Sequence, residues 1–165
     1  MPRAAETARL EAHPVYPWNP RREPPLAGLR VLLVDDERES RALLTAFLSL
    51  EGVQAVAVAD VLEALMALES ESFDLVIADL GLPGASGYDL LRAVRRRPGP
   101  MQEIPIIAVT GRSTHEDRDR VLGAGFRAHV AKPVDLQSLL LTIRTAAGRP
   151  PPHPPDAGAW HATGA

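Results

Sequence analysis

The fold is decided by the run Arg30-Val-Leu-Leu-Val-Asp35-Asp36-Glu37. The first part of this run is apolar, with no polar residue between its valines and leucines, which is typical of a strand buried on both faces of a parallel sheet. Four similar runs follow along the chain, at residues 53–58, 74–78, 104–109 and 127–131. Each run has the length of one strand, so the sequence predicts five strands.

Helix-sized segments separate these runs, and their apolar residues recur at helical spacing. Three sets each share one helix face: Leu43, Leu44, Phe47 and Leu48; Val61, Leu62, Leu65, Met66 and Leu68; and Leu90, Leu91 and Val94. Met66 and Phe73 are expected in the core. The three arginines at residues 95–97 are expected in solvent, because positive charge is favourable at a helix C-terminus.

Residues suited to helix ends support the same division of the chain. Ser113 and Glu116 have the spacing of a capping box, and Asp135 can cap the last helix. Gly52 and Gly125 suit the C-terminal ends of helices. Five strand–helix units in alternation predict an α/β fold with a mostly parallel sheet, right-handed crossovers and helices on both faces.

Proline marks the expected limits of the folded part. Of the 16 prolines, six lie in residues 1–25 and five in residues 150–155. Because proline interrupts helix interiors and sheet ladders, both tails are expected to be extended, with a polyproline bias. We therefore divide the chain into a Pro-rich N-terminal extension at residues 1–27, one domain at residues 28–148 and a Pro-rich C-terminal tail at residues 149–165.

Length and composition exclude several classes of protein. The 165 residues fit one ordinary domain and not two. The absence of cysteine excludes a disulfide framework, a thiolate zinc site and a cysteine nucleophile. A net charge of -3 argues against binding nucleic acid through phosphate neutralisation. With neither a signal-peptide core nor an apolar stretch long enough for a membrane span, the protein is expected to be cytoplasmic, with no membrane partner.

Acidic residues stand at two of the predicted strand ends. Asp35 and Asp36 follow the first strand, and Asp79 follows the third. Ligands of open α/β sheets bind outside the carboxyl ends of strands, where these three carboxylates would repel one another unless a cation lay between them. Ligation by oxygen alone favours Mg²⁺ over zinc or copper. An alternative is that Asp35 or Asp36 caps the following helix.

Two further polar residues end the fourth and fifth strands. Lys132 is the only lysine in a chain with 17 arginines, which suggests a need for a compact point charge there, although a chance surface lysine is the alternative. Lys132 could pair with an anion on Asp79, and Thr110 could donate a hydrogen bond to the same anion. A carboxylate nucleophile, a divalent cation, a cationic side chain and a hydroxyl donor describe a phosphoryl-transfer site.

Four sequence motifs, in order, carry a resemblance to a known family. They are Val-Leu-Leu-Val-Asp35-Asp36-Glu37, Asp74-Leu-Val-Ile-Ala-Asp79-Leu-Gly-Leu-Pro83, Pro105-Ile-Ile-Ala-Val-Thr110-Gly111 and Ala131-Lys132-Pro133. With these motifs the chain resembles the receiver domain of two-component response regulators over residues 29–148. The resemblance implies a doubly wound, flavodoxin-like (βα)5 fold with a five-stranded parallel sheet in the order 2-1-3-4-5.

The resemblance also implies roles for the residues at the strand ends. Asp79 would be the phosphoacceptor, and Asp35 and Asp36 would bind Mg²⁺ together with Asp79 and the backbone carbonyl of Gly81. Gly81 lacks the side chain that in many relatives influences the attacking water. Arg112 places a cation near the mouth of the pocket.

The phosphoryl oxygens would be bound by Thr110 and Lys132, and the Lys132–Pro133 peptide is expected to be cis, as is usual in the family. Thr110 and His129 would form the switch, because His129 stands where many receivers carry a Tyr or Phe that turns inward on activation. The alternative for His129 is a strand histidine partly packed against the fourth helix.

Several functions are compatible with these features. The first is a single-domain response regulator that takes a phosphoryl group from a phosphohistidine of a sensor histidine kinase or histidine phosphotransfer protein. It would then act on a downstream protein target or in a phosphorelay, and would be no enzyme beyond its own phosphorylation and dephosphorylation. The alternative is a receiver-fold binding module that acts without phosphorylation. A Mg²⁺-dependent aspartate-nucleophile phosphatase and a dinucleotide-binding fold fit the motifs less well.

Overall fold

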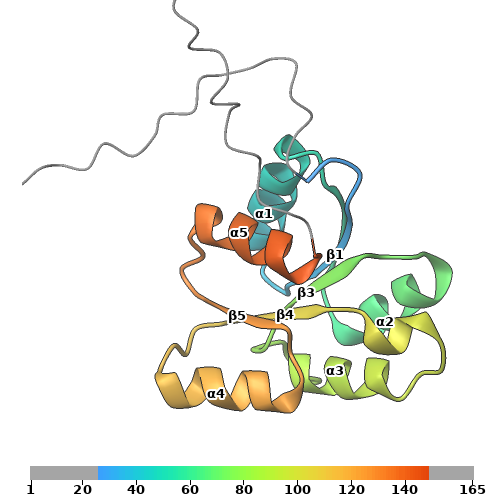
Figure 1. Ribbon diagram of the computed structural model, residues 1–165, viewed down its shortest axis with the longest axis vertical. Coiled ribbons are helices and arrows are strands. Elements are labelled where there is room, and N and C mark those ends of the chain that lie inside the picture. The colour runs from blue at the N-terminus through green and yellow to red at the C-terminus, as the bar shows by residue number, and fades with distance from the viewer. Residues whose placement is uncertain (1–25, 149–165) are drawn as a thin grey trace, which may run out of the picture.

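A computed structural model describes residues 26–148 of the chain. Strands and helices alternate along this part of the chain (Figure 1). The elements are β1 (Arg30–Val34), α1 (Arg38–Leu50), β2 (Gln54–Val58), α2 (Val61–Ser70), β3 (Leu75–Asp79), α3 (Gly87–Arg95), the 3-10 helix η1 (Pro100–Glu103), β4 (Ile106–Thr110), α4 (His115–Ala124), β5 (Ala128–Ala131) and α5 (Leu136–Ala146).

The five strands form one parallel sheet in the order β2-β1-β3-β4-β5, as expected. The chain leaves β1 toward one edge of the sheet to form β2, and then crosses to the other side of β1 to form β3, β4 and β5. This reversal makes the carboxyl ends of β1 and β3 the topological switch point, where open α/β sheets bind their ligands.

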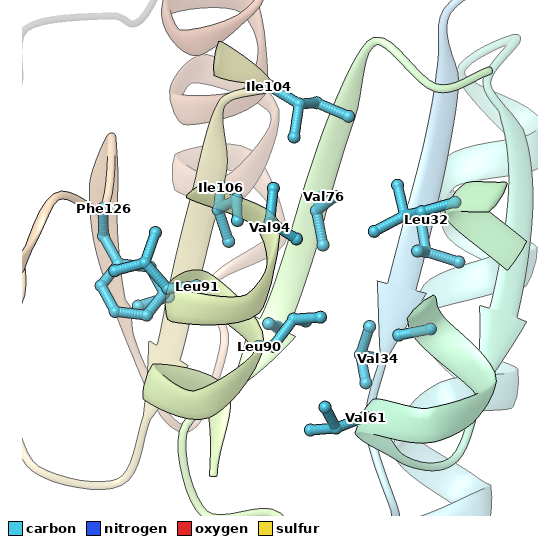
Figure 2. Close-up of a cluster of buried hydrophobic side chains, with 14 of the residues drawn as sticks. Leu32, Val34, Val61, Val76, Leu90, Leu91, Val94, Ile104, Ile106 and Phe126 are labelled. Atoms are coloured by element: carbon cyan, nitrogen blue, oxygen red, sulfur yellow. The ribbon is translucent and has the colours of Figure 1, made fainter. Parts of the chain in front are cut away.

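Helices cover both faces of the sheet, α1 and α5 on one face and α2, α3 and α4 on the other (Figure 1). The face toward α2, α3 and α4 is lined by Leu32, Val34, Val76, Ala78, Ile106 and Ala108, several of which Figure 2 shows beside Leu90 and Val94 of α3. The face toward α1 and α5 is lined by Val31, Leu33, Leu75, Ile77, Ile107 and Val109. Because successive strand residues are buried on opposite faces, the runs carry no polar alternation.

The limits of four strands differ from the prediction by one or two residues, and two of these differences matter for the site. β4 begins at Ile106 and not at Ile104, because η1 precedes it and Pro105 has no backbone N–H to donate to a ladder. Pro105 still accepts a hydrogen bond from the Val76 N–H through its carbonyl. β3 extends by one residue to include Asp79, so this carboxylate belongs to the rigid sheet and not to the loop after it.

Most of the predicted helix ends are confirmed. The Asp135 side chain accepts a hydrogen bond from the Ser138 N–H at the start of α5, and Gly125 is left-handed (φ 113°) at the end of α4. The prediction that Ser113 caps α4 is wrong by one residue. Thr114 is the cap, because its hydroxyl accepts a hydrogen bond from the Asp117 N–H and hydrogen-bonds to the Asp117 carboxylate.

A capping box does occur, but at the start of α3. The Ser86 side chain accepts a hydrogen bond from the Asp89 N–H, and the Asp89 carboxylate accepts one from the Ser86 N–H. Gly87, the first residue of α3, is buried against the end of β3. The start of α3 is therefore fixed beside Asp79.

One expectation about the core is wrong, and the expectation that residues 95–97 are solvated holds for exposed Arg96 but not for Arg95. Met66 is 61% exposed, because it lies on the outer face of α2 while Ala64 and Leu68 face the core. Arg95 is not simply solvated: its guanidinium donates hydrogen bonds to the carbonyls of Gln102 and Ile104 and so joins the end of α3 to the chain around η1. Burial lowers the pKa of Arg95, which the charge of Glu103 partly offsets.

The expectation that Phe73 belongs to the core is confirmed, since its half-buried ring packs against the cluster under α2 and α3. Leu26 is fully buried between the sheet and its α1–α5 layer. No helix among residues 26–148 combines the length and the apolar character needed to cross a membrane. Residues 1–25 of the N-terminal extension and all of the C-terminal tail, residues 149–165, lie outside the described part of the chain.

Candidate functional site

Polar residues meet where four neighbouring strands end. Asp35 directly follows β1, Asp79 ends β3, Thr110 ends β4 and Lys132 directly follows β5. Because these strands are parallel and adjacent in the order β1-β3-β4-β5, their carboxyl ends lie along one edge of the sheet. The sheet therefore brings together residues that are nearly a hundred positions apart in sequence.

Three carboxylates form the acidic side of this site. Asp35, Asp36 and Asp79 each place one oxygen within 4.8 Å of the others. Asp35 and Asp79 are only 3% and 7% exposed, whereas Asp36 is open to solvent. Such a group of oxygen ligands, two buried and one at the surface, suits Mg²⁺, which is bound by a few carboxylates and keeps several waters.

Asp35 is held in place by the first turn of α1. Its Oδ1 accepts a hydrogen bond from the Glu37 N–H (2.9 Å) and its Oδ2 accepts one from the Ser40 hydroxyl (2.6 Å). Asp36 does not cap the helix, because the residue at the N-cap is Glu37, whose side chain makes no capping hydrogen bond. The capping alternative thus holds in part for Asp35, which orders the helix start and also belongs to the acidic cluster.

Lys132 forms the cationic side of the site. Its Nζ lies 2.5 Å from Oδ2 of Asp79 and 4.0 Å from Oδ2 of Asp35. Burial of the ammonium disfavours its charge, but the hydrogen bond to Asp79 and the charges of Asp79, Asp35 and Glu37 outweigh this effect and raise the pKa of Lys132. The contact with Asp79 excludes a chance surface position, and the peptide between Lys132 and Pro133 is cis, as expected.

The second oxygen of Asp79 faces the loop that follows β3. Oδ1 accepts a hydrogen bond from the Gly81 N–H (2.7 Å). A Cβ at Gly81 would lie 3.4 Å from this oxygen, which is an ordinary contact. Asp79 therefore has one oxygen on an ammonium and one on a backbone amide, and both fix its orientation.

A cavity of about 570 Å³ opens beside Asp79. It is lined by Asp79, Thr110 and Lys132 and also by Tyr88, Arg112 and Arg120. Thr110 is 9% exposed, and its hydroxyl oxygen accepts a hydrogen bond from the Arg112 N–H (3.1 Å). Because a hydroxyl can accept and donate at once, the Thr110 proton remains available for an acceptor in the cavity.

His129 does not line this cavity. Its half-buried ring lies in a separate groove of about 340 Å³ between α4 and α5, beside Leu122 and Leu141. Its Nε2 lies 3.2 Å from the carbonyl oxygen of Arg112, whose N–H donates to Thr110. Two hydrogen bonds through Arg112 therefore join His129 to Thr110.

Comparison with known proteins assigns the family. The sequence model described as "Response regulator receiver domain" matches residues 31–144. The chain belongs to this family. Receiver domains work in two-component signalling with histidine kinases as partners. The family match argues against the two alternative functions, an aspartate-nucleophile phosphatase and a dinucleotide-binding protein.

Relatives of this receiver domain differ in length. An uncharacterized 14.6 kDa protein of Leptolyngbya boryana is 34% identical over 119 residues, which is 72% of this chain and 90% of that protein. The transcriptional regulatory protein TcrA of Mycobacterium tuberculosis is 33% identical over 131 residues, which is 79% of this chain but 51% of TcrA. The chain thus spans nearly all of one curated relative and about half of another.

Solved receiver structures share the fold. The chemotaxis protein CheY4 of Vibrio cholerae matches with a TM-score of 0.65 and 28% identity, over 72% of this chain and 98% of CheY4. The receiver domain of the sensor histidine kinase PA1611 from Pseudomonas aeruginosa matches with a TM-score of 0.67 and 30% identity, over 74% of this chain and 99% of that domain. That structure has a magnesium ion coordinated in its active site cleft.

The sequence analysis missed several residues of the site. Ser40 and Arg41 hold Asp35 from α1, the arginine through a hydrogen bond to the Asp35 carbonyl (2.6 Å). Tyr88 and Arg120 line the cavity from α3 and α4. A polar residue in the first turn after Asp35 was a usable signal for Ser40, whereas nothing in the sequence near Arg120 marks which face of α4 looks toward Asp79.

Proposed function

We propose that this receiver domain accepts a phosphoryl group on Asp79, with Mg²⁺, from a phosphohistidine of a sensor histidine kinase or histidine phosphotransfer protein. The proposal is supported chiefly by one observation: one carboxylate oxygen of each of Asp35, Asp36 and Asp79 lies within 4.8 Å of the others, and the Lys132 ammonium lies 2.5 Å from Oδ2 of Asp79. The phosphorylated protein would act through a downstream protein partner or pass the group on in a relay, and its chemistry would stop at its own phosphorylation and dephosphorylation.

The metal would be held by the carboxylates of Asp35, Asp36 and Asp79 and by the backbone carbonyl of Gly81. The close approach of the three carboxylates supports this assignment, because their mutual repulsion is relieved by a divalent cation. When bound, Mg²⁺ would supply positive charge that offsets the negative charge of the phosphoryl oxygens.

In the transfer, an Asp79 carboxylate oxygen forms a bond to phosphorus while the bond between phosphorus and the donor imidazole nitrogen breaks. The electron pair of the broken bond returns to the imidazole, and the product is an acyl phosphate on Asp79. Lys132 can bind one phosphoryl oxygen from its present position, and the Thr110 hydroxyl can donate its free proton to another. Positioning and charge supply most of the catalysis in such a site.

The contacts around Arg112 support a route from Asp79 to the surface. If Thr110 moves toward the phosphoryl group, the backbone of Arg112 must follow or the Thr110–Arg112 hydrogen bond must break. If the backbone of Arg112 follows, its contact with the ring of His129, which lines the groove between α4 and α5, changes as well. Thr110 and His129 would then form the switch that a partner reads.

The test is to incubate the protein with Mg²⁺ and phosphoramidate or acetyl phosphate and to look for an added phosphoryl group by mass spectrometry. We expect labelling of the wild type, no labelling of Asp79→Asn, and a strong loss of labelling when the metal is chelated. Labelling of Asp79→Asn to the wild-type extent would remove Asp79 as acceptor. An unlabelled wild type would favour a binding module that acts without phosphorylation.

A further inference from the structure

The cavity beside Asp79 has a cationic wall that the proposed reaction does not yet use. Besides Lys132, two arginines line this cavity: Arg112 from the loop after β4 and Arg120 from α4. Among residues 26–148, neither guanidinium forms a hydrogen bond or an ion pair. Both charges are therefore available to an anion in the cavity.

One carboxylate, Asp117, shares this wall. Its oxygen is already hydrogen-bonded by the hydroxyl of Thr114 at the start of α4. That hydrogen bond lowers the pKa of Asp117, and the nearby charges of Arg112 and Arg120 lower it further. The wall thus carries two cations against one anion, whose carboxylate is held by the hydroxyl of the capping residue Thr114, and this leaves a positive excess toward the cavity.

Lys132 alone is poorly matched to a phosphoryl group on Asp79. Its ammonium faces Asp79 at 2.5 Å and Asp35 at 4.0 Å, so its charge is already shared between two carboxylates. Phosphorylation would replace the single negative charge of Asp79 by about -1.5 to -2. The added charge would project into the cavity, where Arg120 is one of two cations without a partner.

We propose that Arg120 is a second phosphoryl-binding residue, which stabilises the phosphoryl group on Asp79 by its charge across the cavity. This inference rests on the proposed function of Asp79. The helical spacing supports the placement, because Asp117, Arg120 and Val121 lie three and four residues apart on the face of α4 that lines this cavity. Arg118 instead lines the groove on the other side of α4, with Leu122.

Arg118 therefore offers a matched control. Arg120→Gln and Arg118→Gln remove the same charge from exposed positions two residues apart on one helix, but from opposite sides of it. Arg120→Lys keeps the charge. Because Arg120 is exposed and makes no hydrogen bond within the described part of the chain, none of these variants is expected to unfold the domain.

The probe is beryllofluoride, an inert analogue of the phosphoryl group, titrated in the presence of Mg²⁺ and followed by calorimetry. We expect Arg120→Gln to weaken binding about threefold, as for an ion pair open to water, and Arg120→Lys and Arg118→Gln to stay near the wild type. The threefold difference should shrink in high salt, since screening weakens exposed charge pairs.

The inference is overturned if Arg120→Gln binds beryllofluoride as tightly as the wild type. It is also overturned if Arg118→Gln loses as much affinity, which would indicate net charge alone, or if Arg120→Lys loses as much, which would indicate shape. These outcomes leave Asp79 labelling by phosphoramidate intact. Failure of the wild type to be labelled or to bind the probe would instead refute the proposed function, and this inference with it.

Discussion

The start of α3 touches the end of β3 so closely that the contact admits only glycine. A Cβ added at Gly87 would lie 2.7 Å from the backbone oxygen of Asp79 and 2.8 Å from Cδ2 of Leu80. Real Cβ atoms essentially never come within 3.0 Å of a heavy atom outside their own residue and its chain neighbours, so Gly87→Ala must move α3 or the end of β3. The Asp79 backbone is part of the sheet and cannot yield in the way a flexible side chain can.

The movement would disturb the core on that side of the sheet. Leu90 and Val94 of α3 are fully buried, and Figure 2 shows them directed at the strands. Overpacking that shifts a helix against such a core costs about 1–3 kcal/mol of the free energy of unfolding. At about 4 °C per kcal/mol for a domain of this size, the melting temperature should fall by roughly 4–12 °C.

Gly123→Ala is the matched control. Gly123 lies inside α4, is exposed and has no atom within 4 Å of an added Cβ. Alanine there should stabilise the helix by about 0.5–1 kcal/mol, because glycine loses more backbone entropy on folding. The same entropic gain acts at Gly87, so the difference between the two variants in thermal or urea unfolding isolates the clash. If Gly87→Ala proves as stable as Gly123→Ala, the close approach of α3 to Asp79 is refuted.

Three further results are expected. Added MgCl2 should raise the melting temperature of the wild type more than that of Asp36→Asn, because a ligand of the folded state stabilises it; equal shifts would exclude Asp36 as a ligand. Arg95→Ala should lower the free energy of unfolding by about 1–2 kcal/mol in urea, since two backbone carbonyls lose a charged donor, whereas exposed Arg96→Ala should change it by less than about 0.5 kcal/mol. Hydrogen bonds from the Ser138 hydroxyl and N–H lower the pKa of Asp135, so the stability that this cap gives α5 is present above the ordinary carboxyl pKa and is lost as the pH falls through the lowered pKa. Ser138→Ala should raise the pKa of Asp135 in an NMR titration. An unchanged pKa would contradict the hydrogen bond from the hydroxyl.

The strands and their order could be predicted because burial on both faces leaves a strong trace in the sequence. In the run at residues 30–34, no polar residue follows Arg30 until the strand ends. The first polar residues after such runs mark the carboxyl ends of the strands, which form the edge of the sheet where ligands bind. The positions of Asp35, Asp79, Thr110 and Lys132 follow from this rule alone, once the strands are parallel.

Details that depend on side-chain direction could not be predicted in the same way. Met66 has the helical spacing of a core residue, but α2 turns it outward, because its apolar stripe is wider than the face that the sheet covers. The cap of α4 was misplaced because Ser113 and Thr114 each have an acidic residue three positions later, and only the backbone decides between them. The place of Arg120 beside the cavity could not be predicted either, because it depends on how α4 is rotated about its own axis.

The use of lysine and not arginine beside Asp79 has a physical reason in the geometry. One Nζ is near both Asp79 and Asp35, at 2.5 and 4.0 Å, because an ammonium is compact and directs its donors to several acceptors. A guanidinium prefers a planar, bidentate contact with both oxygens of a single carboxylate. At this site it would compete for Oδ1 of Asp79, which the Gly81 N–H now holds, and both acceptor oxygens would be engaged by one cation. Lysine instead leaves Oδ1 of Asp79 to the Gly81 N–H and also lies near Asp35, so one compact charge stabilises two of the three carboxylates that hold the metal in the proposed function.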